Sequence, residues 1–380
     1  MNMLHLLRLQ LAACAFAWLA SAPPVTAQEQ LRRGSSNGQL VDDELRQAVQ
    51  RGHEWLQAHQ GKDGAWSELV GYKVNTDYET LDSRPQPHVG VTALALISFL
   101  AGGHLPDRGK YGDVLHRGID FVLECAQDDG QITRNGTRMY SHAFATLFLA
   151  EVYGMVERAD VKKTLQRSVD LIVDSQNAEG GWRYRPFARE SDMSITVCQV
   201  LALRSARNVG IHVPITTIRQ AQNYVYRSAV RGNERTYRLG GHGAFGDDGG
   251  SFRYQNREQT RATFPLTAAG VTTLYAAGEY DSPIIRDALD YMDRQMPIFN
   301  DDWQNHYFFY YGHYYAVQAY YITGDPKWSK YFRTIKQLLL SRQKKDGSWP
   351  CATGPGDAFA TAVATLILQI PLQYLPIFQR

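Results

Sequence analysis

The sequence lacks the features that mark several common protein classes. It has only four cysteines in 380 residues, and they are widely scattered, so there is no disulfide framework of the kind that holds small secreted domains together. Neither Cys-x-x-Cys nor His-Glu-x-x-His occurs, which excludes the simple zinc motifs. Stability must therefore come from core packing, and a composition with 44% hydrophobic and 21% charged residues is suited to a globular core.

The sequence also lacks an excess of charge of either sign. Its 40 basic residues nearly balance its 38 acidic ones, which leaves a formal net charge of +2. This balance gives no electrostatic reason to expect nucleic acid or an acidic lipid surface as a partner. We therefore expect no nucleic-acid partner.

The apolar run near the N-terminus extends from about Leu9 to Ala20 and is short for a membrane span. It follows Arg8 and precedes the small residues of Val25-Thr-Ala27. This order predicts a signal peptide over residues 1–27, then a flexible segment over 28–40 and a single domain over 41–380. We expect an exported protein, periplasmic or extracellular, without strong membrane association after cleavage; an uncleaved anchor is the alternative.

A phrase of the form Gln-x-x-acid-Gly-x-Trp occurs three times, at Gln60–Trp66, Gln176–Trp182 and Gln343–Trp349. Each copy follows an amphipathic helical segment, and weaker relatives bring the number of such segments to six. They cover residues 45–60, 118–132, 168–176, 221–230, 288–296 and 332–343. The phrase is suited to a structural joint, in which Gly takes the left-handed turn that ends the helix, the indole covers a neighbouring helix, and Gln and the acid bond helix-end groups.

Between these segments lie six others that are apolar on most sides. They begin at His88, His142, Asp192, Thr263, Tyr311 and Asp357. Helices that are apolar all round are suited to burial, whereas the amphipathic segments are suited to an outer layer. The sequence thus predicts an all-α protein, an (α/α)6 toroid of six helical hairpins with an inner ring inside an outer ring.

The phrase resembles the QW repeat of terpene cyclases, and the series of hairpins resembles the prenyltransferase and squalene-oxidase repeat superfamily. The resemblance extends from about Val41 to Pro376 and implies an α/α toroid with a central aromatic cavity. It is much less specific for the reaction, because that superfamily includes cyclases, protein prenyltransferases and non-enzymatic domains.

The catalytic motifs of that superfamily are not retained. Terpene cyclases carry Asp-x-Asp-Asp-Thr-Ala, and the corresponding stretch from Asp192 to Val197 has Ser194 in place of the acid and Ile195 in place of its supporting carboxylate. Since a Ser hydroxyl cannot protonate an alkene, we expect no conventional proton-initiated cyclisation. The stretch that resembles the last zinc ligand of the prenyltransferases has Ala360 at the ligand position.

The inner segments begin with a polar residue that is followed four positions later by Thr or Tyr. The pairs are His88/Thr92, His142/Thr146, Asp192/Thr196, Thr263/Thr267, Tyr311/Tyr315 and Asp357/Thr361. Spacing of four places both members on one helix face, so we expect polar groups at the mouth of the ring. The predicted ligand-binding residues are His88, His142, Asp192, Thr196, Tyr311, His313 and Asp357.

Two further hypotheses rest on the same residues. Asp192 and Asp357 are the candidate catalytic groups, and His88, His142, Asp192 and Asp357 together form a candidate site for a divalent metal; no other cofactor is implied. The alternative is structural: the aspartates are N-caps and the histidines make local hydrogen bonds. The aromatic stretch 306–321 is suited equally to core packing and to a cavity wall.

The leading functional hypothesis is a protein that binds an isoprenoid or other apolar ligand, or that serves as a scaffold. A carbohydrate-active (α/α)6 enzyme, either a glycosidase or a polysaccharide lyase with a glycan ligand, is the second. A divergent cyclase that uses another acid is the third.

Overall fold

The computed structural model describes residues 37–38, 40–71, 80–231, 249–257, 260–301, 308–351 and 354–379. The chain divides into two units, Met1–Gln39 and Leu40–Arg380. The predicted signal peptide and nearly all of the 28–40 segment lie outside the described residues, and helices α3 to α14 belong to the second unit. None of the described helices is long and apolar enough to cross a membrane.

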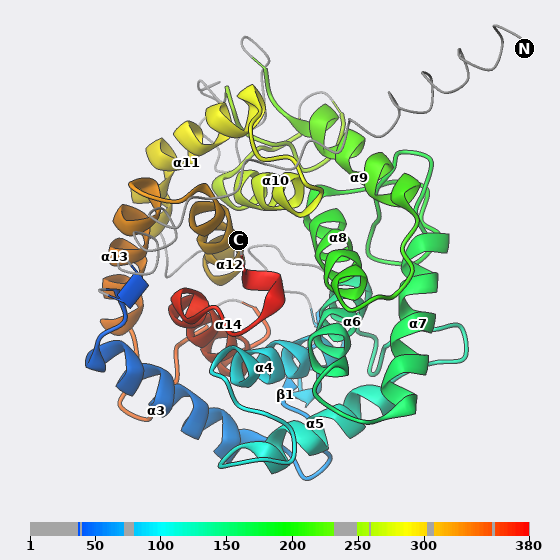
Figure 1. Cartoon of the computed structure of the whole chain (residues 1–380), viewed down its shortest axis with the longest axis vertical. Coiled ribbons are helices and arrows are strands. Elements are labelled where there is room, and N and C mark those ends of the chain that lie inside the picture. The colour runs from blue at the N-terminus through cyan, green and yellow to red at the C-terminus, as the bar shows by residue number, and fades with distance from the viewer. Residues whose placement is uncertain are drawn as a thin grey trace, which may run out of the picture. The chain divides into compact units, whose positions relative to one another are not determined.

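Six helices form a closed inner ring, in which each packs against the next and the last packs against the first (Figure 1). They are α4 (Val89–Ala101), α6 (Met139–Tyr153), α8 (Met193–Asn208), α10 (Phe264–Ala276), α12 (Phe308–Thr323) and α14 (Asp357–Gln369). Their sequences are apolar on most sides, and every residue of α4 is buried. This is the burial expected of a helix with no polar face.

Six amphipathic helices surround this ring. They are α3 (Asp43–His59), α5 (Gly112–Glu124), α7 (Ala159–Asp174), α9 (Ile215–Ser228), α11 (Pro283–Asp301) and α13 (Lys327–Leu340). In α3, Leu45, Val49, His53 and Leu56 are buried at intervals of about one helical turn. The predicted double ring of six hairpins is confirmed.

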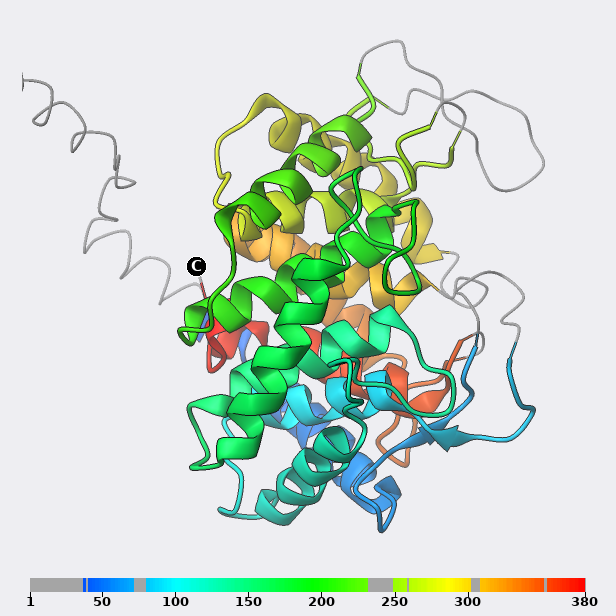
Figure 2. The same cartoon turned by 90° about the vertical axis from the view of Figure 1, so that its right-hand side faces the viewer.

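As expected of an all-α protein, the described residues contain few strands. Strands β1 (Ser67–Glu68) and β2 (Gln86–Pro87) form one short antiparallel pair. In the side view, this pair lies on the same side of the ring as the start of α14, and the C-terminus lies on the opposite side (Figure 2).

The C-terminal tail crosses the ring at the end where the inner helices finish. Two short 3-10 helices, η1 (Ile370–Leu372) and η2 (Pro376–Phe378), follow α14 directly. η1 contacts α12 and α14, and η2 reaches α8 on the other side of the ring. Ile377 and Phe378 are buried, so the tail covers this end with apolar side chains.

The repeated phrase ties an outer helix to an inner one through its tryptophan. The indole Nε1 of Trp182 donates to the carbonyl of Ile172 in α7 at 2.7 Å, and its backbone N–H donates to Oγ1 of Thr196 in α8 at 3.2 Å. The same two bonds join Trp66 to Leu56 and Thr92, and Trp349 to Leu339 and Thr361. All three indoles are buried, which confirms the structural interpretation of the phrase.

The glutamine of the phrase reaches the next outer helix. Nε2 of Gln176 donates to the carbonyls of Gly180 and of Thr217 in α9, both at 2.9 Å. Gln60 bonds Gly64 and Val114 in the same way, and Gln343 bonds Gly347 and Ala48. The last of these bonds joins the final hairpin to the first and closes the outer ring.

The glycine has a positive φ, as predicted, but it does not end the helix. Helix α7 finishes at Asp174, whereas the left-handed residue Gly180 has a φ of +86° and turns the chain beyond it. A Cβ at this position would lie 2.4 Å from the carbonyl oxygen of Gln220 in α9. The glycine is therefore needed both for the turn and for close approach to the next outer helix. The acid bonds nearby loop amides instead of a helix end, as Glu179 does with the N–H of Ser191.

Candidate functional site

A cavity of about 100 Å³ lies inside the ring, between the first two turns of α4, α6, α12 and α14. Its apolar lining includes Val91, Leu94, Phe144, Phe359 and Val363. Its polar lining consists of His88, Thr137, Arg138, Tyr140, Ser141, Tyr184, Tyr311 and Tyr314. Among the described residues that line it there is no Asp or Glu. The cavity therefore offers apolar surface, aromatic rings and hydroxyl groups, but no acid.

Tyrosines gather at one side of this cavity. The ring of Tyr140 lies 6.2 Å from that of Tyr184 and 6.4 Å from that of Tyr311, measured between ring centroids. Burial raises the pKa of Tyr140 and of Tyr311 well above the ordinary value for a phenol. These side chains consequently remain neutral hydroxyl groups over the whole physiological pH range.

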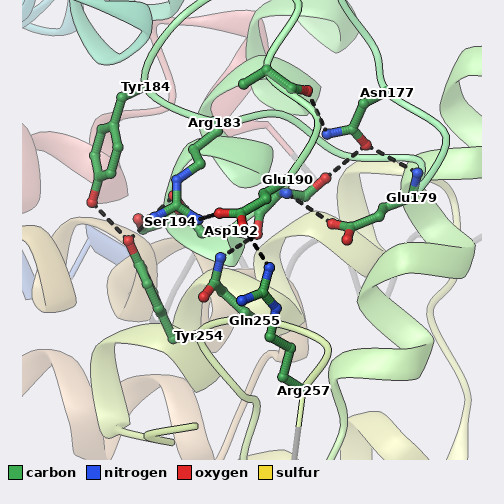
Figure 3. Close-up of polar contacts among 12 residues, drawn as sticks. Asn177, Glu179, Arg183, Tyr184, Glu190, Asp192, Ser194, Tyr254, Gln255 and Arg257 are labelled. Carbon is green, nitrogen blue, oxygen red and sulfur yellow. Dashed lines mark hydrogen bonds and ion pairs between the residues drawn. The ribbon is translucent and has the colours of Figure 1, made fainter.

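A buried carboxylate, Asp192, lies near Tyr184 (Figure 3). Its Oδ1 accepts hydrogen bonds from the hydroxyl of Ser194 at 2.6 Å and from the N–H of Ile195 at 2.9 Å, and so caps α8. Its Oδ2 accepts from the hydroxyl of Tyr254 at 3.3 Å. Burial raises the pKa of Asp192, although these hydrogen bonds act in the opposite direction.

The hydroxyl of Tyr254 lies 2.7 Å from that of Tyr184, so a chain of polar groups runs from the cavity wall to Asp192 (Figure 3). Two ion pairs connect the loops around Asp192. Glu190 forms ion pairs with Arg183 at 2.8 Å and with Arg257 at 2.7 Å.

Of the residues predicted from sequence, His88 and Tyr311 line the cavity. His88 is the N-cap of α4, and its Nδ1 accepts a hydrogen bond from the N–H of Val91 at 3.2 Å. Burial lowers the pKa of His88 to about 4, so the ring is neutral at physiological pH. We expected Tyr311 to begin its helix. Instead, it lies one turn inside α12.

The two other histidines point away from the cavity, contrary to expectation. His142 lies inside α6, where its Nδ1 accepts from the N–H of Ile132 at 3.0 Å and its Nε2 donates to the carbonyl of Ser168 in α7 at 3.2 Å. Burial lowers the pKa of His142 to about 4. Both ring nitrogens are thus committed to structural bonds with the joint and the outer layer.

His313 faces the outer layer as well. Its Nε2 donates to Oδ1 of Asn300 in α11 at 2.8 Å, and its Nδ1 accepts from the hydroxyl of Tyr331 in α13 at 2.9 Å. Burial lowers the pKa of His313 to about 3. The aromatic segment around it is divided: Tyr311 and Tyr314 line the cavity, while several of its neighbours are core residues. The first two residues of that stretch, 306 and 307, lie outside the described residues.

Asp357 and Thr196 also have structural partners. Asp357 is the first residue of α14 and not its cap; its Oδ1 accepts from the N–H of Cys351 at 2.9 Å and its Oδ2 pairs with Lys344 at 2.6 Å. Thr196 accepts from Trp182 and donates to the carbonyl of Asp192 at 2.8 Å. Neither residue lines the cavity.

The candidate metal ligands do not come together. His142 faces α7, and Asp357 is paired with Lys344, so the four predicted side chains cannot form one coordination shell. In the part of the chain that the structure describes, no three His, Cys, Asp or Glu side chains form a group that could hold a metal ion.

The sequence analysis missed Tyr184 and Tyr254, because both lie in joints and not on helices. A signal was nevertheless present. Tyr184 follows Gly-Gly-Trp-Arg, and Tyr254 follows Gly-Ser-Phe-Arg, so the two tyrosines hold equivalent positions in successive repeats. In both joints the aromatic residue, Trp182 or Phe252, is followed by Arg-Tyr, and this shared sequence would have identified the two tyrosines as equivalent.

Comparison with known proteins agrees with this architecture. Residues 36–149 match the family model of the squalene-hopene cyclase C-terminal domain. The apo structure of the type II terpene cyclase MstE from Scytonema is 13% identical and covers 88% of this chain and 100% of its own, with a TM-score of 0.57. The chain has the terpene cyclase-like repeat fold.

Glycosidases share the same ring. An inactive variant of an α-1,6-mannanase from Salegentibacter, in complex with α-1,6-mannotriose, is 7% identical over 86% of this chain and 98% of its own, with a TM-score of 0.59. A family 76 mannosidase from Bacteroides thetaiotaomicron is 10% identical over 85% and 97%, with a TM-score of 0.54. No curated protein matches the chain significantly in sequence. At these identities the likeness concerns the fold alone, so the function of this terpene cyclase-like ring must be argued from its own cavity.

Proposed function

We propose that the protein binds an apolar, isoprenoid-type ligand in the cavity of the inner ring. The observation that carries this proposal is the composition of the wall, in which aliphatic and aromatic side chains from four inner helices surround the space without a carboxylate among the described lining residues. Apolar pockets with a few well-placed polar groups are typical ligand sites. A protein with the same fold, MstE, has been observed in complex with geranylgeranyl dihydroxybenzoate, which supports the choice of ligand class.

The size of the cavity limits what it encloses. Its volume of about 100 Å³ is somewhat smaller than the roughly 150 Å³ of an apolar cavity that takes up benzene. It therefore suits one branched five-carbon unit and not a long folded chain. We propose that one end of the ligand enters the cavity while the remainder extends through its mouth.

Binding accounts for the site better than cyclisation does. Protonation of a double bond needs a strong acid that touches the substrate. Asp192 is 0% exposed, its oxygens accept from Ser194, Ile195 and Tyr254, and it is not among the residues that line the cavity. We therefore propose a binding protein with no cyclase activity on polyprenes.

Glycan hydrolysis fits the wall less well. Most glycosidases place two carboxyl groups on opposite sides of the scissile bond. The described lining of this cavity contains no such pair, although mannosidases share the fold. The carbohydrate hypothesis thus has support from the fold but none from the site.

The test is equilibrium binding of radiolabelled geranylgeraniol, with α-1,6-mannotriose as competitor. We expect saturable binding that mannotriose does not displace. Val91→Phe, which fills the cavity, should weaken binding by at least about tenfold, since an added ring displaces the ligand. The matched control is Val173→Phe on the outer helix α7, where the side chain is only partly buried and does not line the cavity. Equal binding by both variants, or displacement by mannotriose, would refute the proposal.

We also propose that the protein acts outside the cytoplasm. Support comes from the N-terminal sequence, in which a basic residue, a short apolar run and small residues before Gln28 occur in the order of a signal peptide. N-terminal sequencing of the mature protein should begin at Gln28. An intact N-terminus in the cytosolic fraction would contradict this.

A further inference from the structure

A chain of hydrogen bonds connects the cavity wall to a buried carboxylate. Tyr184 lines the cavity, its hydroxyl lies 2.7 Å from that of Tyr254, and the hydroxyl of Tyr254 lies 3.3 Å from Oδ2 of Asp192 (Figure 3). Each phenol has one hydrogen to donate, whereas an ionised carboxylate can only accept. The direction of the chain therefore determines what Tyr184 can offer a ligand.

The direction follows from the acceptor at its inner end. A carboxylate attracts a hydroxyl hydrogen more strongly than a phenol oxygen does, so the hydrogen of Tyr254 is donated to Asp192. The contact between the two tyrosines then needs the hydrogen of Tyr184. With that hydrogen committed, the oxygen of Tyr184 has only lone pairs left, and it can act toward a ligand solely as an acceptor.

The surrounding structure holds this arrangement in place. The N–H of Tyr254 donates to the carbonyl of Arg261 at 2.9 Å, and the N–H of Met193 donates to the carbonyl of Tyr254 at 2.8 Å. The guanidinium of Arg261 lies over the ring of Tyr254, 4.4 Å from its centroid. Oδ1 of Asp192 is engaged with Ser194 and Ile195, so the carboxylate cannot turn freely.

The neighbouring polar groups of the wall include both acceptors and donors. The hydroxyl of Tyr311 donates to the carbonyl of Ser194 at 3.4 Å, so its hydrogen is also committed. His88 uses Nδ1 as an acceptor, which places the ring hydrogen on Nε2. Arg138 lines the cavity too, and it has an interaction partner of its own. The wall thus combines two phenol acceptors, Tyr184 and Tyr311, with donors on His88 and on Tyr314, whose buried hydroxyl has no hydrogen-bond partner among the described residues. A hydroxyl group on the ligand can satisfy both kinds.

We propose that the hydroxyl chain from Asp192 through Tyr254 to Tyr184 selects an isoprenoid ligand that ends in a neutral hydroxyl group. The hydroxyl hydrogen is donated to the oxygen of Tyr184. A hydrocarbon leaves the oxygen of Tyr184 without a donor, while a phosphate or carboxylate places its own lone pairs against those of Tyr184. This inference rests on the proposed function, since it specifies the ligand of the same cavity.

The first experiment compares three ligands that carry the same isoprenoid chain, at neutral pH and constant salt. They are geranylgeraniol, its methyl ether and geranylgeranyl diphosphate. We expect the alcohol to bind about tenfold more tightly than the ether, which cannot donate, and more tightly than the diphosphate. If none of the three binds, the proposed function fails. If the ether equals the alcohol, or the diphosphate binds most tightly, ligand binding stands but the selection of a hydroxyl is wrong.

The second experiment changes the chain of hydroxyl groups in the protein. Tyr254→Phe frees the hydrogen of Tyr184, so the preference for alcohol over ether should fall from about tenfold to less than about threefold. Tyr320→Phe is the matched control, because Tyr320 is also a buried phenol that donates to an aspartate, Asp293 at 2.7 Å, and it does not line the cavity. The control should leave the preference unchanged even if it lowers stability.

A third variant reverses the direction of the hydrogen bonds between Asp192, Tyr254 and Tyr184 instead of breaking them. In Asp192→Asn, the side-chain amide can donate to Tyr254, whose hydrogen then moves toward Tyr184, and the hydrogen of Tyr184 becomes free to enter the cavity. The ether should then bind at least as tightly as the alcohol. A tenfold preference for the alcohol that persists in a folded Asp192→Asn or Tyr254→Phe protein would overturn the inference.

Discussion

Two kinds of joint connect the outer helix of a hairpin to its inner helix, and their difference shows which parts of the repeat are indispensable. The joints after α3, α7 and α13 carry tryptophan, whereas those after α5 and α9 carry Ile132 and Phe252 at the equivalent position. All five donate the backbone N–H of this residue to a side chain of the next inner helix. Ile132 donates to Nδ1 of His142 at 3.0 Å and Phe252 to Oγ1 of Thr267 at 3.1 Å.

The glycine is common to both kinds of joint. Gly130 and Gly250 have φ values of +90° and +89°, and a Cβ on either would lie 2.4 and 2.3 Å from a carbonyl oxygen of the next outer helix. What the second kind lacks is the indole bond to the preceding helix. The glycine and the amide bond are therefore the common framework, and tryptophan is an additional tie between layers.

The largest expected effect separates the two kinds of joint directly. Trp182→Ala removes a fully buried indole and its bond to Ile172, and should lower the free energy of unfolding by about 3–5 kcal/mol. Ile132→Ala should cost at least about 1 kcal/mol less, because no side-chain hydrogen bond is lost there. Chemical denaturation monitored by circular dichroism measures both.

Trp55→Ala provides the control, since Trp55 is only partly buried and stacks on His59 at the surface of α3. It should cost about 1 kcal/mol or less. If Trp182→Ala were no more destabilising than Trp55→Ala, the role of tryptophan as a tie between layers would be wrong.

A smaller effect tests the common framework. Gly180→Ala adds both an unfavourable positive φ and a clash with the carbonyl of Gln220, whereas Gly210→Ala adds only the first, since Gly210 has the same φ of +86° and nothing within 4 Å. We expect about 1 kcal/mol of destabilisation for Gly210→Ala and about 3 kcal/mol for Gly180→Ala. Thermal and chemical unfolding of the two variants should show this difference; equal values would mean that the close approach is relaxed at little cost.

The smallest effect concerns the amide bond to the inner helix. Thr196→Val keeps the shape of the side chain but leaves the buried N–H of Trp182 without its acceptor, and should cost about 1–2 kcal/mol. Thr196→Ser retains the hydroxyl and should lose less than half of that amount. If Thr196→Val left the free energy of unfolding unchanged, the N–H of Trp182 would have found another acceptor.

The sequence was sufficient to predict the fold, because the apolar and amphipathic segments and the Trp phrases are periodic. It was also sufficient to suggest that Asp192 could be a cap. The positions of His142 and Tyr311 were misjudged because the two residues were aligned by type at the expected helix starts, whereas α6 begins at Met139 and both side chains lie one turn further in. Helical spacing shows which residues share a face, but not whether that face meets the cavity or the outer layer.

The polar chain behind the cavity could not be predicted by periodicity. Tyr184 and Tyr254 are 70 residues apart, and they meet only because two successive joints deliver them to the same place. Such a contact depends on the three-dimensional path of the loops. The shared Arg-Tyr sequence indicates equivalence of position, but not the direction of a hydrogen bond.

The bond from Gln343 to Ala48 has a consequence for how the ring closes during folding. Its geometry matches the bonds that Gln60 and Gln176 make, but it joins residues 295 positions apart, against 54 and 41 for the other two. Bringing such distant segments together costs about 1.5 kcal/mol more in chain entropy than closing a neighbouring pair. The bond between the first and last hairpins thus carries the largest chain-entropy cost of the three. We therefore expect the first and last hairpins to come together last during folding, after neighbouring hairpins have packed.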